Sequence, residues 1–169
     1  MATVKDDVIS AQGRILDSLI DCELRIAATY KAFAVAFPLF ADFWESLARE
    51  ERQHGLVLKK LHGCLARGFL FENIGRFDQV AMNSLQVIQD DAERAMAAGV
   101  MDASEAFAVA LKLERSLIES QFYVCVKSDA PEFTAVCKVL NGATERHVAK
   151  LHAAVANNTA PDAPFFDRN

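Results

Sequence analysis

The sequence predicts an all-α protein, a four-helix bundle whose second and third long helices are joined by a long crossover connection carrying an extra helix. Three observations favour this fold. Alanine, leucine and valine are common, and only 7 glycines and 4 prolines interrupt 169 residues, a composition that favours helices. Apolar residues recur three, four and seven positions apart over long stretches. The breaks between these stretches are short, except for one in the middle of the chain.

The first half of the chain contains two long helices. The first is predicted over residues 6–36 and ends before Pro38, which cannot continue a helix. The second is predicted over residues 40–66. An apolar, glycine-containing connection over 67–76 then leads to a shorter helix over 77–98.

The second half begins with a capping signal. Asp102 or Ser104 is expected to cap the third long helix, which we predict to run to about Lys127. Pro131 suits the first turn of the fourth long helix, which is predicted to end near Asn158.

The lengths of the connections predict the topology. Short links make the helices of each pair antiparallel, so the long central connection must return across the bundle, and one such crossover is the ferritin-like arrangement. We therefore expect one ferritin-like domain over residues 1–158 and an irregular tail over 159–169. A single domain also suits the chain length.

Net charge, cysteine spacing and apolar stretches limit the classes of partner and the cellular compartment that we expect. The net charge of −5, without a lysine or arginine run, argues against nucleic acid or an anionic membrane as the main partner. The cysteines are too far apart to form a Cys-x-x-Cys pair, and buried thiols in a reducing compartment are expected. The most apolar stretch, residues 32–41, is too short to span a bilayer. Because residues 1–7 lead into polar sequence rather than a signal peptide, we expect a cytoplasmic protein.

The main functional signal is a set of polar residues on helix faces that should be apolar. Side chains seven positions apart on a helix differ by only about 20° in direction. In the first helix, Glu23 interrupts a column that also holds Leu16 and Tyr30. In the second, Glu51 and His54 stand where leucine would be expected.

The second pair of helices repeats this conflict. Apolar residues surround Glu114 in the third helix, and Thr144 and His147 in the fourth. A buried, unpaired carboxylate costs several kcal/mol or stays protonated, so a cation would make the convergence tolerable. A dinuclear bundle site takes a Glu from each of two helices and a Glu-x-x-His from each of the other two. The predicted metal ligands are Glu23, Glu51, His54, Glu114 and His147.

Two other interpretations stay open at this point. The centre of the bundle could be a polar core without a metal. Alternatively, Glu23 and Glu114 could be solvated if the helix registers differ from those assumed.

Three segments carry a family resemblance. Glu23 and Tyr30 lie seven residues apart in the first helix. Residues 47–54 read Leu-Ala-Arg-Glu-Glu-Arg-Gln-His, and Glu105 precedes Glu114 by nine residues. With these motifs the chain resembles the rubrerythrin branch of the ferritin-like superfamily over nearly its whole length.

This resemblance implies one or two iron ions, with manganese or zinc as alternatives, and redox chemistry with peroxide or dioxygen. Tyr30 would lie beside the site as a catalytic residue, although a core tyrosine with a satisfied hydroxyl is an equal alternative. No rubredoxin-like cysteine domain is present, so an external electron donor protein is expected.

The chain departs from the family pattern at two buried positions. Thr144 stands where the second Glu-x-x-His would have its glutamate, and Leu117 stands where the family has a further one. Asp90, Asp91 or Glu93 on the crossover helix could supply a substitute carboxylate, and a solvated face is the other interpretation.

The departures leave two further functions open: non-catalytic iron handling or sensing, and a metal-free structural bundle with a degenerate site. Large apolar helix faces, with Phe69 and Phe71 in the crossover, favour a homodimer.

Overall fold

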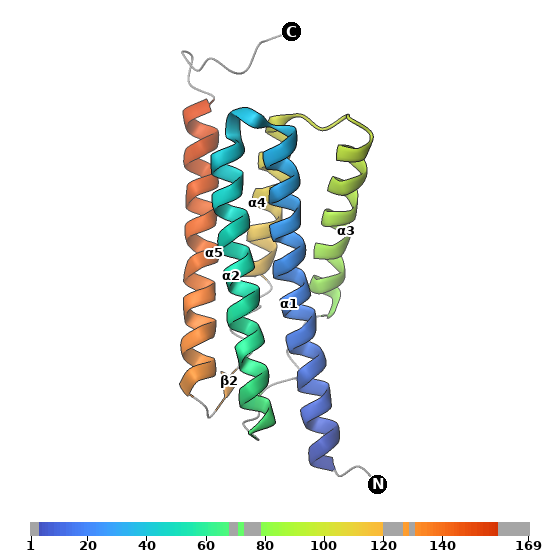
Figure 1. Cartoon of the computed structure of the whole chain (residues 1–169), viewed down its shortest axis with the longest axis vertical. Helices are drawn as coiled ribbons and strands as arrows, with labels where there is room; N and C mark the ends of the chain where they lie inside the picture. The colour runs from blue at the N-terminus through green and yellow to red at the C-terminus, as the bar shows by residue number, and fades with distance from the viewer. Residues whose placement is uncertain (1–3, 68–70, 73–78, 120–126, 129–130, 159–169) are drawn as a thin grey trace.

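A computed structural model describes residues 4–67, 71–72, 79–119, 127–128 and 131–158. This part of the chain contains five α-helices and one pair of two-residue strands (Figure 1). The helices are α1 (Val4–Ala36), α2 (Ala41–Ala66), α3 (Gln79–Ala97), α4 (Ala103–Glu119) and α5 (Pro131–Asn158). The all-helical prediction is therefore confirmed, and the predicted tail lies outside the described residues.

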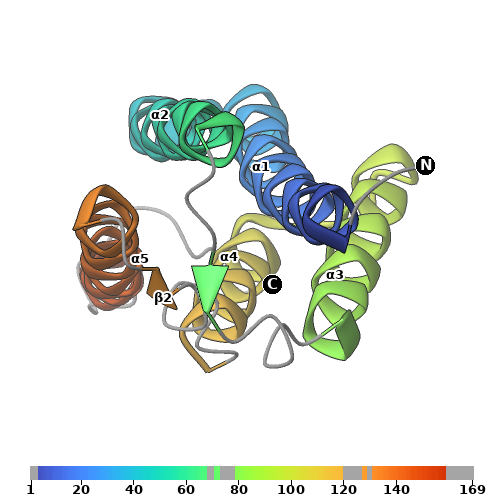
Figure 2. The same cartoon turned by 90° about the horizontal axis from the view of Figure 1, so that it is seen from below.

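Helices α1, α2, α4 and α5 lie side by side around a common core, and α3 packs outside them against α1 and α4 (Figures 1 and 2). A 3₁₀ turn, Pro38–Phe40, reverses the chain between α1 and α2, so these two helices are antiparallel. Helix α3 runs antiparallel to α2, back toward the end of the bundle that carries the α1–α2 turn, so α2 and α4 point the same way (Figure 1). As a result, α1, α2, α4 and α5 all pass through the middle of the bundle, where side chains from each can meet.

One predicted boundary is wrong. The third long helix was expected to reach Lys127, but α4 is described only to Glu119, and Lys127 lies in strand β2 (Lys127–Ser128). Strand β2 pairs antiparallel with β1 (Phe71–Glu72), with Lys127 opposite Glu72. Residues 120–126, which the prediction also placed in this helix, lie outside the described residues.

The start of α4 is fixed by a reciprocal cap. The backbone N–H of Glu105 donates to the Asp102 Oδ1 at 2.8 Å, and the N–H of Asp102 donates to the Glu105 Oε2 at 2.9 Å. This capping box satisfies two backbone donors that the first turn leaves free. Just before it, Gly99 follows the end of α3 with a φ of 67°, a left-handed conformation that suits glycine. Asp102, rather than Ser104, is the capping residue.

The crossover helix is tied to α1 by exposed ion pairs. Arg25 contacts Asp90 at 2.5 Å and Glu93 at 3.6 Å, and Asp91 pairs with Arg94 within α3. The three acidic residues therefore form a solvated face, and none is a substitute ligand at the bundle centre. None of the described helices combines the length and the apolarity needed to cross a membrane.

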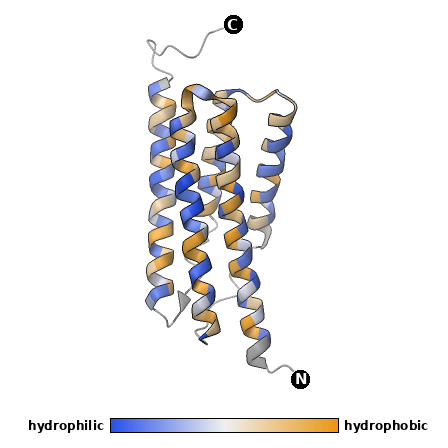
Figure 3. Cartoon of the chain, in the orientation of Figure 1, coloured by the Kyte–Doolittle hydropathy of each residue, from blue (hydrophilic) through white to orange (hydrophobic). Residues whose placement is uncertain are grey.

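The core has an aromatic end and an aliphatic end. Next to the α1–α2 turn, Trp44 packs against Phe107 with ring centroids 4.6 Å apart and against Phe33 at 5.2 Å. Toward the other end, Leu19 and Leu58 are 0% and 1% exposed. Hydrophobic and hydrophilic residues alternate along every helix (Figure 3), as expected when one face is buried. The predicted ligands lie between the two apolar layers.

Candidate metal centre

The five predicted ligand residues meet at the middle of the bundle. Glu23 comes from α1, Glu51 and His54 from α2, Glu114 from α4, and His147 from α5. The His54 side chain is 11% exposed, and the other four residues are at most 2% exposed. The alternative in which Glu23 and Glu114 are solvated is therefore excluded.

Glu51 joins the five donors into two overlapping groups. Its Oε2 lies 2.8 Å from the Nδ1 of His54, and its Oε1 lies 2.5 Å from the Nδ1 of His147. One group is Glu23, Glu51 and His54, and the other is Glu51, Glu114 and His147. Each offers three ligand atoms within 4.8 Å of one another. Glu51 is therefore the carboxylate that the two groups have in common, and it could contribute to the binding of a cation in either group.

The first group, which we call the Glu23 group, is poorly satisfied. Neither carboxyl oxygen of Glu23 receives a hydrogen bond from a described residue, and the His54 Nδ1 lies 3.7 Å from the Glu23 Oε2. Burial raises the pKa of Glu23 well above 4.5, and the nearby negative charge of Glu51 adds to the rise. Without a cation, the protonated form of Glu23 is therefore favoured over a wider range of pH than for a solvated glutamate.

The second group, the Glu114 group, has more partners. The Tyr30 hydroxyl donates to the Glu114 Oε1 at 2.7 Å, and the His147 Nδ1 lies 3.4 Å from the same oxygen. The Glu114 Oε2 is buried without a hydrogen bond from a described residue. Burial and the Glu51 charge raise the pKa of Glu114 to about 7, although His147 and Tyr30 oppose this rise.

Glu51 and His147 form the charged pair of the centre. Burial alone would raise the pKa of Glu51, but the ion-pair contact with His147 and the hydrogen bond with His54 outweigh it and lower that pKa below 4.5. Burial would also lower the pKa of His147, yet the Glu114 and Glu51 carboxylates raise it to about 10. The raised pKa values of His147 and Glu23 favour bound protons, which reduce the negative charge of the buried carboxylates. A metal cation could reduce the same negative charge in place of these protons.

The donor chemistry fits a transition metal. Carboxylate oxygens and imidazole nitrogens suit iron, manganese and zinc. In the described part of the chain, the ion pairs of Glu23, Glu51 and Glu114 involve only the two histidines, without lysine or arginine. The unpartnered oxygens of Glu23 and Glu114 are acceptors that a cation would satisfy.

Thr144 does not supply a ligand. Its side chain is 2% exposed, and its hydroxyl donates to the carbonyl oxygen of Leu140 on the same helix at 3.1 Å. Leu117, one turn after Glu114, is 1% exposed and adds apolar surface only. Three carboxylates are therefore present at this centre.

Sequence reasoning missed Glu50 as a neighbour of the centre. Its Oε2 lies 3.0 Å from the Nε2 of His147, and its Oε1 accepts a hydrogen bond from the Lys150 Nζ at 2.6 Å. The signal was the adjacency of Glu50 to Glu51, but only the packing of α5 on α2 shows which carboxylate reaches His147.

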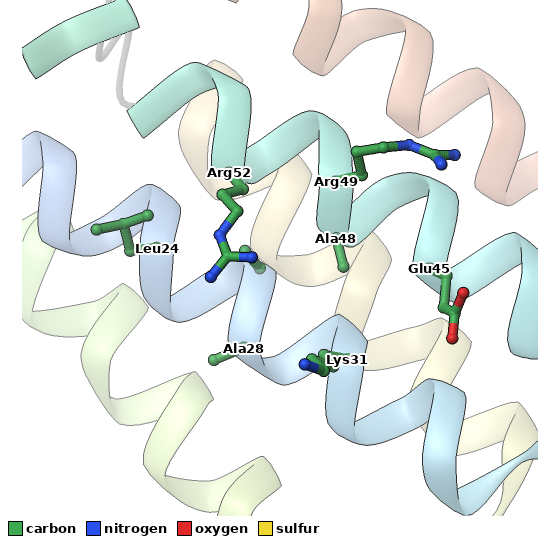
Figure 4. Close-up of a pocket in the computed structure, with 8 residues that line it drawn as sticks. Leu24, Ala28, Lys31, Glu45, Ala48, Arg49 and Arg52 are labelled. Carbon is green, nitrogen blue, oxygen red and sulfur yellow. The ribbon is translucent and has the colours of Figure 1, made fainter. Parts of the chain in front are cut away.

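A groove of about 600 Å³ lies on the outer side of α1 and α2 (Figure 4), and none of the five ligand residues lines it. The Arg52 side chain reaches from α2 toward α1, whereas Arg49 extends in a different direction (Figure 4). Because these cations do not converge on one point, the groove has no evident role in the chemistry of the centre.

Comparisons with known proteins do not assign the chain to a family: no family model, curated protein or solved structure matches it.

Proposed function

We propose that this chain is a ferritin-like protein of the rubrerythrin type, with a centre that binds iron, or manganese or zinc in its place. The observation that carries the proposal is the position of Glu51. One buried carboxylate contacts two histidines from different helices and belongs to both ligand groups. The helix order, with one crossover between α2 and α4, supports the ferritin-like part of the proposal.

When bound, iron would supply redox chemistry with peroxide or dioxygen. Glu23, Glu51 and Glu114 would neutralise its charge, and His54 and His147 would direct Nδ1 toward it. The aromatic and leucine layers exclude bulk water from the centre. Burial raises the pKa of Tyr30 well above 10, so its hydroxyl stays protonated and holds Glu114 as a hydrogen-bond donor. An external protein would deliver the electrons.

A second candidate function is non-catalytic metal handling or sensing. Two divalent ions carry a charge of +4, whereas the three buried glutamates supply at most −3. The hydroxyl of Thr144 is engaged by Leu140 and offers no fourth carboxylate. We therefore expect clearly fewer than two ions per chain.

Metal analysis and a turnover assay separate the functions. The full chain, purified without chelator, is assayed for metal content and then exposed to peroxide with an artificial reductant, while ferric absorption is followed. Repeated bleaching and recovery supports the redox enzyme, and bound iron without turnover supports metal handling. A colourless protein whose stability does not respond to iron or chelator would contradict metal binding and leave a structural bundle.

The substitution Thr144→Glu tests the incomplete site directly. A fourth buried carboxylate should raise the metal content toward two ions per chain. It should also destabilise the metal-free protein by about 2 kcal/mol or more, because another acid is buried. Thr144→Gln adds similar volume without charge and should leave the metal content unchanged. An equal effect of both variants on metal content would contradict the charge argument.

The homodimer remains a prediction. Phe69 lies outside the described residues, and only the backbone of Phe71 is described. A measurement of molar mass in solution decides this point.

A further inference from the structure

The two ring nitrogens of His147 face different surroundings. Nδ1 points into the centre, 2.5 Å from the Glu51 Oε1 and 3.4 Å from the Glu114 Oε1. Nε2 points the other way and lies 3.0 Å from the Glu50 Oε2. The imidazole is fully buried, so its orientation is set by these three carboxylates.

Glu50 is itself held in place. Its second oxygen accepts a hydrogen bond from the Lys150 Nζ at 2.6 Å. The side chains of Glu50 and Lys150 are 35% and 42% exposed, so the pair lies at the edge of the bundle between α2 and α5. Lys150 follows His147 by one helical turn, and both therefore face Glu50.

A metal-bound imidazole must present a lone pair to the ion and keep its proton on the other nitrogen. An acceptor at one ring nitrogen fixes the proton there and orients the ring. Glu50 provides this acceptor at the Nε2 of His147, which leaves Nδ1 to face the centre. In the described part of the chain, no contact of this kind holds the Nε2 of His54, whose contacts with Glu23 and Glu51 both involve Nδ1.

We propose that Glu50 is a positioning residue of the centre: it holds the Nε2–H of His147 so that Nδ1 is available as a ligand, and Lys150 orients Glu50. This inference rests on the proposed metal-binding function. It assigns a role to a residue outside the five ligands, and it makes the two histidines unequal in how they are supported.

The test compares Glu50→Ala and Glu50→Gln with Glu45→Ala, which removes an exposed carboxylate from the same helix. Cobalt(II) affinity of the full chain is measured against a competing chelator. Glu50→Ala should weaken binding about 10–100-fold, the usual range for such supporting groups. Glu50→Gln should weaken it less, because the amide oxygen still accepts a hydrogen bond. Glu45→Ala should leave the affinity unchanged.

A second readout separates positioning from a merely structural role. Long-range ¹H–¹⁵N spectra of the zinc-loaded protein should show His147 with its proton on Nε2, and Glu50→Ala should broaden or mix this state. An unchanged cobalt affinity in folded Glu50→Ala would overturn the proposal, even if the melting temperature falls. If Glu50→Ala does not fold, a wild-type His147 with its proton on Nδ1 overturns it. A wild type that binds neither metal overturns the proposed function as well, which distinguishes the two failures.

Discussion

The Glu23 group and the Glu114 group differ in how far the protein itself satisfies their polar atoms. Both oxygens of Glu23 lack a hydrogen bond from the described residues, and the nearby His54 ring is partly exposed. Glu114 instead accepts a hydrogen bond from the Tyr30 hydroxyl and lies beside the Nδ1 of His147. The other ring nitrogen of His147, Nε2, contacts Glu50. The Glu23 group therefore has more acceptor atoms that a cation could satisfy, whereas protein groups already hold the side chains of the Glu114 group in position.

This difference teaches that one centre can contain two unequal metal positions. In the proposed metal-bound state, an ion near Glu23 would contact two oxygens that receive no hydrogen bond from the described residues. An ion near Glu114 must also compete with the proton of His147 and with the Tyr30 hydrogen bond. Because Glu51 belongs to both groups, we expect metal binding in either group to depend on it.

Removal of the shared carboxylate should have the largest effect. Glu51→Gln takes a charged ligand from both groups at once, so metal affinity should fall by at least about 100-fold, the upper end of the range for supporting residues alone. The measurement is a cobalt(II) titration with a competing chelator. If Glu51→Gln keeps the affinity of the unaltered chain, Glu51 is not a ligand shared by the two groups.

Acidity should affect the metal-loaded and metal-free forms in opposite ways. Metal binding requires neutral His147 and ionised Glu23 and Glu114, whose pKa values are about 10, well above 4.5 and about 7. Binding therefore releases protons, and affinity should rise with pH until these groups lose their protons anyway. Calorimetry in buffers of different ionisation enthalpy counts the released protons. Affinity that does not change between pH 6 and 8 would contradict the ligand assignment.

The raised pKa values of Glu23 and His147 also make the stability of the metal-free protein depend on pH. The raised pKa of Glu23 favours the folded state only while the group is protonated, so its contribution declines as pH rises above 4.5. The raised pKa of His147 contributes fully below pH 6.5 and is lost as pH rises toward 10. Chelator-treated protein should therefore melt at a lower temperature as pH increases from 6.5 to 10, and added metal should reduce this decline.

Apolar substitutions should separate the two groups by the sign of their effect. In chelator-treated protein, Glu114→Leu should lower the free energy of unfolding by about 2–3 kcal/mol, because Tyr30 and His147 lose a buried partner. Glu23→Leu should be neutral or stabilising by about 1 kcal/mol, because it removes a carboxyl that few groups satisfy. Urea denaturation measures both. Equal destabilisation by the two variants would remove the distinction between the groups.

The smallest expected effect is that of Tyr30→Phe. Loss of the hydroxyl removes one hydrogen bond to Glu114 and should cost about 1 kcal/mol of stability, with metal affinity lowered less than in Glu50→Ala. If peroxide turnover falls much more than affinity, Tyr30 has the catalytic role that the family resemblance implies. A parallel change in both would leave it as a residue that orients Glu114.

Sequence patterns were most informative where burial depends on position within one helix. The apolar spacing around Glu23, Glu51 and Glu114 correctly placed these acids inside, and Asp102 correctly marked a helix start. The same patterns wrongly extended the third long helix to Lys127, because Lys127 pairs with Glu72 in a strand and that partner lies more than fifty residues earlier in the sequence.

The sequence by itself determined the helices, the buried face of each and the presence of ligand-type residues on those faces, because helical geometry fixes side-chain direction from local spacing. Only the tertiary structure decided that Glu51 lies between both histidines and that Glu50 reaches the far side of His147. These outcomes depend on how α2 and α5 are shifted and rotated against each other, and that docking is set by the packing of the whole core.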